Sequence, residues 1–187
     1  AAALFTTSRA PAAPVVLSRR HLASGRARAV VANAGCANAA TGARGLEDAL
    51  RMATLTAEGL GCAPQEIVVA STGVIGVPLP MDLVSQGIPA AVAALSAEGG
   101  ADAARAILTT DTRPKEASAE VTLGGARVRI GAMAKGAGMI APRMATLLAF
   151  FTTDTAIEPA LLKRALSAAM ERSEEHTSEL QSLAYIV

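Results

Sequence analysis

The segment KGAGMIAPRMATLLAF, residues 135–150, decides much of the fold because it leads from a loop directly into a strand. Its first half mixes glycines with a proline, a composition typical of irregular loops. Residues 146–154, TLLAFFTTD, then form a largely apolar run that predicts a buried strand. The sequence therefore predicts a loop that delivers the Ala145–Thr146 peptide bond to the beginning of this strand.

Thr146 at this junction is suited to a chemistry that needs no histidine. A threonine hydroxyl can attack the carbonyl that precedes it if the backbone is strained and the carbonyl oxygen is polarised. Hydrolysis of the resulting ester leaves a free α-amine, whose ordinary pKa of about 7.7–8.0 suits a general base. Spacing alone does not establish this role, because a threonine that opens a strand is usually structural.

Hydrophobic patterns on either side of this segment predict a chain in which helices and strands interleave. Residues 121–130 alternate apolar and polar side chains around Gly124–Gly125, which predicts a hairpin and a sheet that is not purely parallel. Pro89 should break or kink a helix over residues 81–96. We also expect strands at 14–18, 27–32 and 66–71, loops at 33–42 and 72–80, and helices at 44–60, 101–108 and 158–171.

Composition argues against several classes of function. The formal net charge is +1 and only 2% of residues are aromatic, so neither a nucleic acid nor an anionic membrane surface is indicated as a partner. No apolar run reaches the roughly 18 residues of a membrane span. The two histidines and two cysteines lie in no catalytic or metal-ligand motif. We therefore expect no metal, no disulfide framework and no histidine-activated nucleophile, in a reducing cytoplasm.

The two ends of the chain have an unusual character. The sequence begins with AAALFTTSRAP, without an initiator methionine or a signal peptide. The stretch RSEEHTSELQS near the other end resembles the translation of a common sequencing adapter. We therefore expect a truncated domain over residues 1–172 and a non-native tail over 173–187, with a solvated terminal helix as the alternative for the tail.

Four ordered segments resemble those of one enzyme family. They are NAGCANAATG (33–42), VASTGVIGVPLP (69–80), LTTDTRPK (108–115) and the opening segment, 135–150. Together they resemble the glutamate N-acetyltransferases, also called ornithine acetyltransferases, whose precursor cuts itself before the threonine of Met-Ala-Thr. The resemblance implies cleavage between Ala145 and Thr146. It also implies an α+β fold, a layered sandwich with mixed sheets of the N-terminal-nucleophile type.

The resemblance also implies a role for individual residues. Thr146 matches the nucleophile, which also contacts substrate, and Thr72 and Gly73 match the pair that forms the oxyanion hole. Lys135 matches a substrate-binding lysine. Without the resemblance, the Thr72–Gly73 pair would be interpreted as an ordinary turn and Lys135 as a solvated surface residue.

Other positions are less firmly assigned. Thr109 and Thr110 lie where the family has one substrate-binding threonine; Thr110 is favoured, although the register is open and both could be capping residues. Asn33 and Asn38 lie in a loop that we place near the site, with turn formation as an equal alternative. The chain departs from the family at Cys36, where asparagine is usual, and at Ala141, where histidine is frequent.

The function implied by the resemblance is acetyl transfer in arginine biosynthesis. An acetyl group would pass from N2-acetylornithine to Thr146 and then to glutamate, with acetyl-CoA as a further donor in some members and with no tightly bound cofactor. The family works as pairs of the two cleaved chains in higher oligomers. Two alternatives remain at this stage: a related self-cleaving aminopeptidase, and an inactive truncated fragment.

Overall fold

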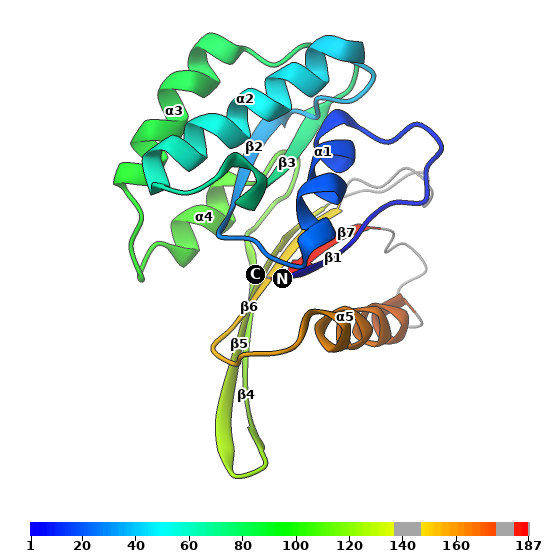
Figure 1. Cartoon of the computed structure of the whole chain (residues 1–187), viewed down its shortest axis with the longest axis vertical. Coiled ribbons are helices and arrows are strands. Elements are labelled where there is room, and N and C mark those ends of the chain that lie inside the picture. Colours follow the sequence, from blue (N-terminus) through cyan, green and yellow to red (C-terminus); the bar gives the residue numbers. More distant parts are fainter. Residues whose placement is uncertain (137–146, 175–181, 187) are drawn as a thin grey trace.

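The computed structural model describes residues 1–136, 147–174 and 182–186. Helices and strands interleave along the chain, as the hydrophobic pattern predicts (Figure 1). The strands are β1 (Ala2–Leu4), β2 (Ala29–Cys36), β3 (Ile67–Val74), β4 (Lys115–Leu123), β5 (Ala126–Lys135), β6 (Leu147–Thr153) and β7 (Ser182–Ile186). The helices are α1 (Ala13–His21), α2 (Gly42–Leu60), α3 (Met81–Ala93), α4 (Gly100–Ala106) and α5 (Pro159–Glu174), with short 3-10 turns at Leu22–Ser24 and Pro64–Glu66.

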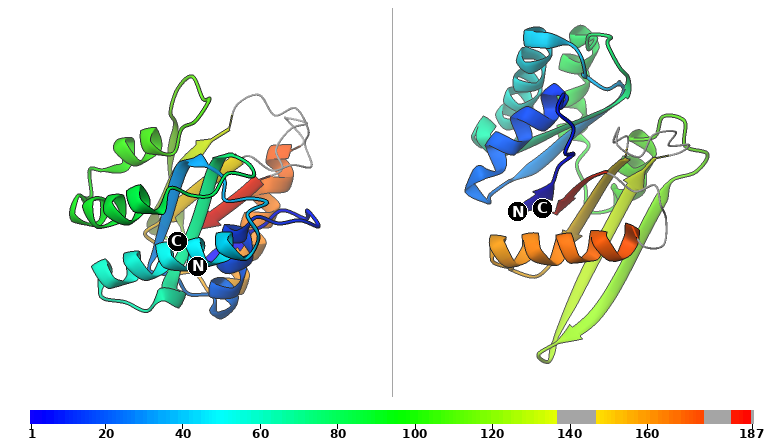
Figure 2. Two further views of the ribbon diagram at one scale, coloured as in Figure 1. Left: turned by 90° about the horizontal axis from the view of Figure 1, so that it is seen from above. Right: turned by 90° about the vertical axis from the view of Figure 1, so that its right-hand side faces the viewer.

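These elements form a layered sandwich, which confirms the predicted α+β fold with mixed sheets (Figure 2). A small sheet of β2 and β3 carries α2 and α3 on one side, has α1 along the edge of β3, and packs on its other side against a larger sheet. The larger sheet has the order β1-β7-β6-β5-β4, and α5 covers its far face. Each interface between layers is apolar, so burial of hydrocarbon holds the layers together.

The small sheet positions the residues that matter most for function. β2 and β3 run parallel, with Asn33 opposite Ser71 and Gly35 opposite Gly73. Both strands continue beyond the predicted strands, into segments that we predicted to be loops, because the two segments pair with each other. Alternate residues face opposite layers: Val68 and Ala70 pack toward the larger sheet, whereas Ile67 and Val69 pack toward the helices.

The prediction of a strand at residues 14–18 is wrong, because this segment lies within α1. Pro14 lies in the first turn of the helix and Arg19, Arg20 and His21 in its last turn, which are signals for the start and end of a helix. α1 lies along the outer edge of β3 and binds its backbone. The buried Ser18 hydroxyl donates to the carbonyl of Val69 (2.7 Å) and accepts from its N–H (2.8 Å).

Helices α2 and α3 cover the small sheet in an apolar layer. The predicted helix at 44–60 is confirmed, and it ends at Gly61 with a positive φ of 64°. Its fully buried face includes Ala49, Met52 and Ala53. α3 runs continuously across Pro89 and ends at Ala93, so the proline does not break this helix.

The larger sheet is built around the predicted hairpin. β4 and β5 pair antiparallel around Gly124–Gly125, and the hairpin extends well beyond the other layers (Figure 1). β6 pairs antiparallel with β5, and Leu148 and Phe150 on β6 pack against the small sheet. Residues 182–186, in the segment predicted as a non-native tail, form β7 between β1 and β6.

The described residues lack two features, a membrane-spanning helix and a cluster of metal-binding side chains. Among them, no helix combines the length and the apolar character that are needed to cross a membrane. The same residues contain no group of three or more histidine, cysteine, aspartate or glutamate side chains that could hold a metal ion. The two cysteines, Cys36 and Cys62, are both free thiols.

Candidate functional site

Thr72 and Gly73 lie near the end of β3, where the strand leaves the core. Gly73 has a φ of 132° and faces Gly35 on β2. A Cβ atom at Gly73 would lie 2.2 Å from both the carbonyl carbon and the oxygen of Gly35. No other residue type fits this position without a shift of the backbone, because both the conformation and the space require glycine.

Lys135, the last residue of β5, is buried beside this end of β3. Only 3% of its surface is exposed, and Thr72 is 6% exposed. The Lys135 ammonium donates a hydrogen bond to Thr72 Oγ1 (3.1 Å) and another to the hydroxyl of Thr109. The interpretation of this lysine as a solvated surface residue is therefore wrong. A buried ammonium must be paired, and its partners here are two hydroxyls and one carboxylate.

That carboxylate belongs to Asp111, whose side chain is fully shielded from solvent. Its Oδ2 lies 3.6 Å from Lys135 Nζ, while its Oδ1 accepts hydrogen bonds from Lys115 Nζ (2.6 Å) and the N–H of Gly136 (2.7 Å). Burial raises the pKa of this carboxyl, but the hydrogen bonds and the two lysine charges outweigh burial and lower it from 3.8 to about 2. Asp111 is therefore ionised throughout the physiological range.

Sequence reasoning missed Asp111. It lies in the segment LTTDTRPK, but an aspartate in a loop is usually solvated, and nothing in its spacing points to a buried partner. The signal that could have found it is the pairing rule: if Lys135 is buried, then an anion must lie nearby. No local pattern around Lys135 indicates that this residue is buried.

The structure distinguishes the two threonines of the loop after α4. Both threonines are exposed residues, but only the hydroxyl of Thr109 accepts a hydrogen bond from Lys135 among the described residues. Sequence reasoning favoured Thr110, so the geometry brings the other candidate to the lysine. The hydroxyls of Thr72, near the end of β3, and Thr109, in the loop after α4, thus converge on one ammonium.

Asn38 has the turn-forming role given as its alternative, whereas Asn33 lies in β2 and not in a loop. Asn38 is completely buried, adopts a positive φ of 48°, donates to the carbonyl of Gly45 and accepts from Thr41. It therefore holds the turn that begins α2. Asn33 donates to the carbonyl of Cys36 (2.9 Å) within β2, next to the pair formed by Ala34 and Thr72.

The predicted nucleophile and cleavage site, Thr146 and Ala145, lie outside the described residues. β6 begins at Leu147, the residue that follows Thr146 in the sequence. The next residue, Leu148, pairs with Lys135 on β5. The first residues of β6 are therefore adjacent to the cluster formed by Lys135, Thr72, Thr109 and Asp111, which we call the Lys135 cluster.

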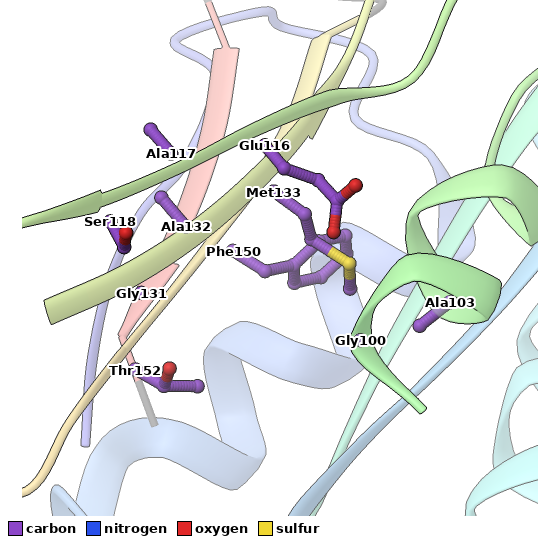
Figure 3. Close-up of a pocket in the computed structure, with 10 residues that line it drawn as sticks. All are labelled: Gly100, Ala103, Glu116, Ala117, Ser118, Gly131, Ala132, Met133, Phe150 and Thr152. Carbon is purple, nitrogen blue, oxygen red and sulfur yellow. The ribbon is translucent and has the colours of Figure 1, made fainter. Parts of the chain in front are cut away.

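A pocket of about 500 Å³ opens farther along the same strands, between α4 and the larger sheet (Figure 3). Its walls include Gly100 and Ala103 from α4 and Met133 and Phe150 from the sheet, with the Glu116 carboxylate directed toward α4. None of the residues of the Lys135 cluster lines it. The convergent polar groups lie in the cluster, so we take the cluster as the candidate site.

Comparison with known proteins gives a consistent result. Residues 1–178 match the model of the ArgJ family. The arginine biosynthesis bifunctional protein ArgJ of Symbiobacterium thermophilum is 61% identical over 173 residues, which cover 92% of this chain and 43% of that protein. The protein of the same name from Geobacter sulfurreducens is 49% identical over 172 residues, 92% of this chain and 44% of that protein. This chain thus spans less than half the length of these curated relatives.

Solved structures agree with the sequence comparisons. The arginine biosynthesis bifunctional protein of Bacillus halodurans superposes with a TM-score of 0.69 at 38% identity, covering 75% of this chain and 74% of that chain. The ornithine acetyltransferase of Mycobacterium tuberculosis, solved in complex with ornithine, gives a TM-score of 0.66 at 37% identity, with 75% of each chain covered.

Proposed function

The chain belongs to the ArgJ family, and we propose that the full-length protein transfers the acetyl group of N2-acetylornithine to glutamate in arginine biosynthesis. By full-length protein we mean this chain continued to the length of its relatives. The observation that carries the proposal is the Lys135 cluster, in which a buried ammonium and two hydroxyls converge beside the first residues of β6. Three of the four family segments supply its members: Thr72 from 69–80, Thr109 and Asp111 from 108–115, and Lys135 from 135–150.

The first step of the proposed chemistry is self-cleavage. The Thr146 hydroxyl attacks the carbonyl carbon of Ala145, the peptide C–N bond breaks, and the chain is joined through an ester. Water hydrolyses this ester, which leaves a carboxylate on Ala145 and a free α-amine on Thr146. The two products are a chain that ends at residue 145 and a chain that begins at 146.

The second step is acetyl transfer through an acetyl-threonine. The free α-amine takes the proton of the Thr146 hydroxyl, whose oxygen attacks the acetyl carbonyl of N2-acetylornithine. The amide C–N bond breaks, and ornithine leaves with the proton on its amine. The amine of glutamate then attacks the acetyl ester, forms N-acetylglutamate and regenerates Thr146.

Thr72 and Gly73 are the proposed oxyanion hole for both steps. The Thr72 hydroxyl accepts a hydrogen bond from Lys135, so its own hydrogen is free to point elsewhere. The close approach of β2 to Gly73 fixes the backbone beside it. Donors of this kind stabilise the negative oxygen of a tetrahedral intermediate, each by about 2.7–4 kcal/mol.

Lys135 and Thr109 are the proposed contacts for the substrate. An ammonium has three N–H donors, and the structure accounts for two of them with hydroxyl partners. The third can reach a substrate carboxylate. Of the two threonines considered, Thr109 is favoured over Thr110 because its hydroxyl already lies within this cluster.

The remaining parts of the proposal concern partners and location. Small amino-acid substrates and the second cleaved chain are the expected partners, and the pairs of chains would assemble into a larger oligomer in the cytoplasm. No metal or bound cofactor takes part in the chemistry proposed here. Acetyl-CoA is an additional donor to be tested.

The proposal is tested by trapping the acetyl-threonine. The full-length protein is mixed with N2-acetylornithine alone, quenched, and analysed by mass spectrometry after proteolysis. We expect the peptide that begins at Thr146 to gain the mass of one acetyl group and to lose it when glutamate is added. Release of ornithine without an acetylated peptide would contradict the mechanism, and cleavage of peptide substrates without acetyl transfer would support an aminopeptidase instead.

A further inference from the structure

The buried ammonium of Lys135 has two kinds of contact, hydrogen bonds to hydroxyls and an ion pair with a carboxylate. Its two hydrogen bonds go to the hydroxyls of Thr72 and Thr109. Its contact with Asp111, at 3.6 Å from Oδ2, is an ion pair that is too long for a hydrogen bond. Among the described residues this oxygen accepts no hydrogen bond, although it is buried. The carboxylate thus neutralises the ammonium without competing with the threonines for its protons.

The direction of the hydrogen bond to Thr72 follows from the chemistry of the ammonium. A protonated lysine has three donors and no acceptor. The hydroxyl of Thr72 must therefore be the acceptor toward Lys135, and its own hydrogen points away from the lysine. If Lys135 lost its proton, its nitrogen could accept that hydrogen, and Thr72 would turn its donor toward the lysine. The charge on Lys135 thus decides whether Thr72 can donate to a ligand.

Asp111 is placed to maintain that charge. An ammonium that is 97% buried needs an anion close to it, and the other charged group that contacts Asp111, Lys115, has the same sign as Lys135. Lys115 reaches the opposite oxygen of Asp111 from the start of β4 and is 42% exposed. Asp111 comes from the loop after α4, and the remaining partners of Lys135, Thr72 and Thr109, are neutral.

We propose that Asp111 is a positioning residue for the oxyanion hole: its carboxylate keeps Lys135 charged and in place, and Lys135 fixes the Thr72 hydroxyl as a donor to the reacting carbonyl oxygen. This inference rests on the proposed function, and it adds a residue that acts through Lys135 and does not touch the substrate. It also gives Lys135 a second task beside the binding of a substrate carboxylate.

The test is Asp111→Asn in the full-length protein. Asparagine keeps an oxygen for the two donors at Oδ1, Lys115 and the Gly136 N–H, but it removes the negative charge beside Lys135. We expect the variant to fold and its kcat for acetyl transfer to fall about 10- to 100-fold, a part of the loss that follows from removal of an oxyanion donor. The kcat profile of the variant should also differ from that of the wild type at alkaline pH, because the negative charge beside Lys135 is gone.

Two comparisons separate this role from structural support. Asp154→Asn is the matched control, because Asp154 also accepts a backbone N–H, that of Arg129 (2.9 Å), at the end of β6 and away from Lys135. It should transfer acetyl groups at the wild-type rate with the wild-type pH profile. In a Thr72→Val background, Asp111→Asn should cause little further loss, because its effect is transmitted through Thr72.

The outcomes are distinct. The inference would be overturned if the effects of Asp111→Asn and Thr72→Val on kcat were fully additive. It would also be overturned if Asp111→Asn left the rate and the pH profile unchanged. In either case an active wild-type protein would leave the proposed function standing. A wild-type protein that is inactive would instead refute the proposed function. Should Asp111→Asn not fold, Asp111→Glu, which displaces the carboxylate by one methylene, enters the same cycle with the same two outcomes.

Discussion

Replacement of Gly73 by alanine tests the geometry on which the oxyanion hole depends. The added Cβ would lie 2.2 Å from the carbonyl carbon and oxygen of Gly35, so β2 and β3 would have to separate by about 1 Å or more to restore ordinary contact. Such overpacking typically costs about 1–3 kcal/mol. The φ of 132° adds a backbone strain of about 1–3 kcal/mol for any residue with a Cβ.

Gly35→Ala isolates the clash from the backbone strain. Gly35 lies directly opposite, has a φ of 119°, and has open space where a Cβ would be placed. The two variants therefore share the strain, and only Gly73→Ala adds the clash. In thermal unfolding of the full-length protein we expect Gly73→Ala to melt below Gly35→Ala, because only Gly73→Ala carries the overpacking cost of about 1–3 kcal/mol.

The same pair of variants is then assayed for acetyl transfer. Displacement of the backbone at Gly73 should lower kcat about 100- to 1000-fold, as the loss of an oxyanion donor does. Gly35→Ala should lose less, because its Cβ meets no neighbouring atom. Equal melting temperatures and equal kcat values for the two variants would refute the argument, since they would mean that the close approach of the two strands has no consequence.

Two further predictions concern stability. Ser18→Ala leaves the N–H and the carbonyl of Val69 without their buried partner, so it should lower the free energy of unfolding by about 2–4 kcal/mol. Thr54→Ala, at an exposed hydroxyl, should lower it by less than about 1 kcal/mol. Chemical denaturation of both variants measures these free energies, and equal effects would contradict the prediction. The pKa of Asp111 falls from 3.8 to about 2 on folding, so its carboxylate contributes about 2–3 kcal/mol that is fully present above about pH 4 and is lost as the pH falls toward 2. The wild type should lose more stability than Asp111→Asn between pH 5 and pH 2 in denaturation curves, and parallel curves would show that the carboxylate adds nothing.

Much of the fold follows from local sequence patterns. The hairpin at 121–130 and the helix at 44–60 have strong periodicity and clear end signals at Gly124–Gly125 and Gly61, and both are confirmed. The run PVVLS at 14–18 shows the limit of this approach. A short apolar run suits a strand or a helix equally, and only the proline at its start and the basic residues after it favour the helix that forms.

The arrangement of the layers and of the site could not be predicted from hydrophobic periodicity alone. Residues 33–36 and 72–74 look like loops by composition, and they become strand because each is the partner of the other. Lys135, Thr109 and Thr72 are distant in the sequence, so only the resemblance to a family connected them before the structure did. Asp111 was missed because its importance comes from the burial of a lysine that sequence alone does not reveal.

The most direct test of the whole account is the intact mass of the full-length protein after purification. We predict two chains that are separated between Ala145 and Thr146, and a single uncut chain for Thr146→Ala. The uncut variant should also transfer no acetyl groups, because it has neither the hydroxyl nor the free α-amine. A wild-type protein that remains a single chain and still transfers acetyl groups from N2-acetylornithine to glutamate would contradict the account.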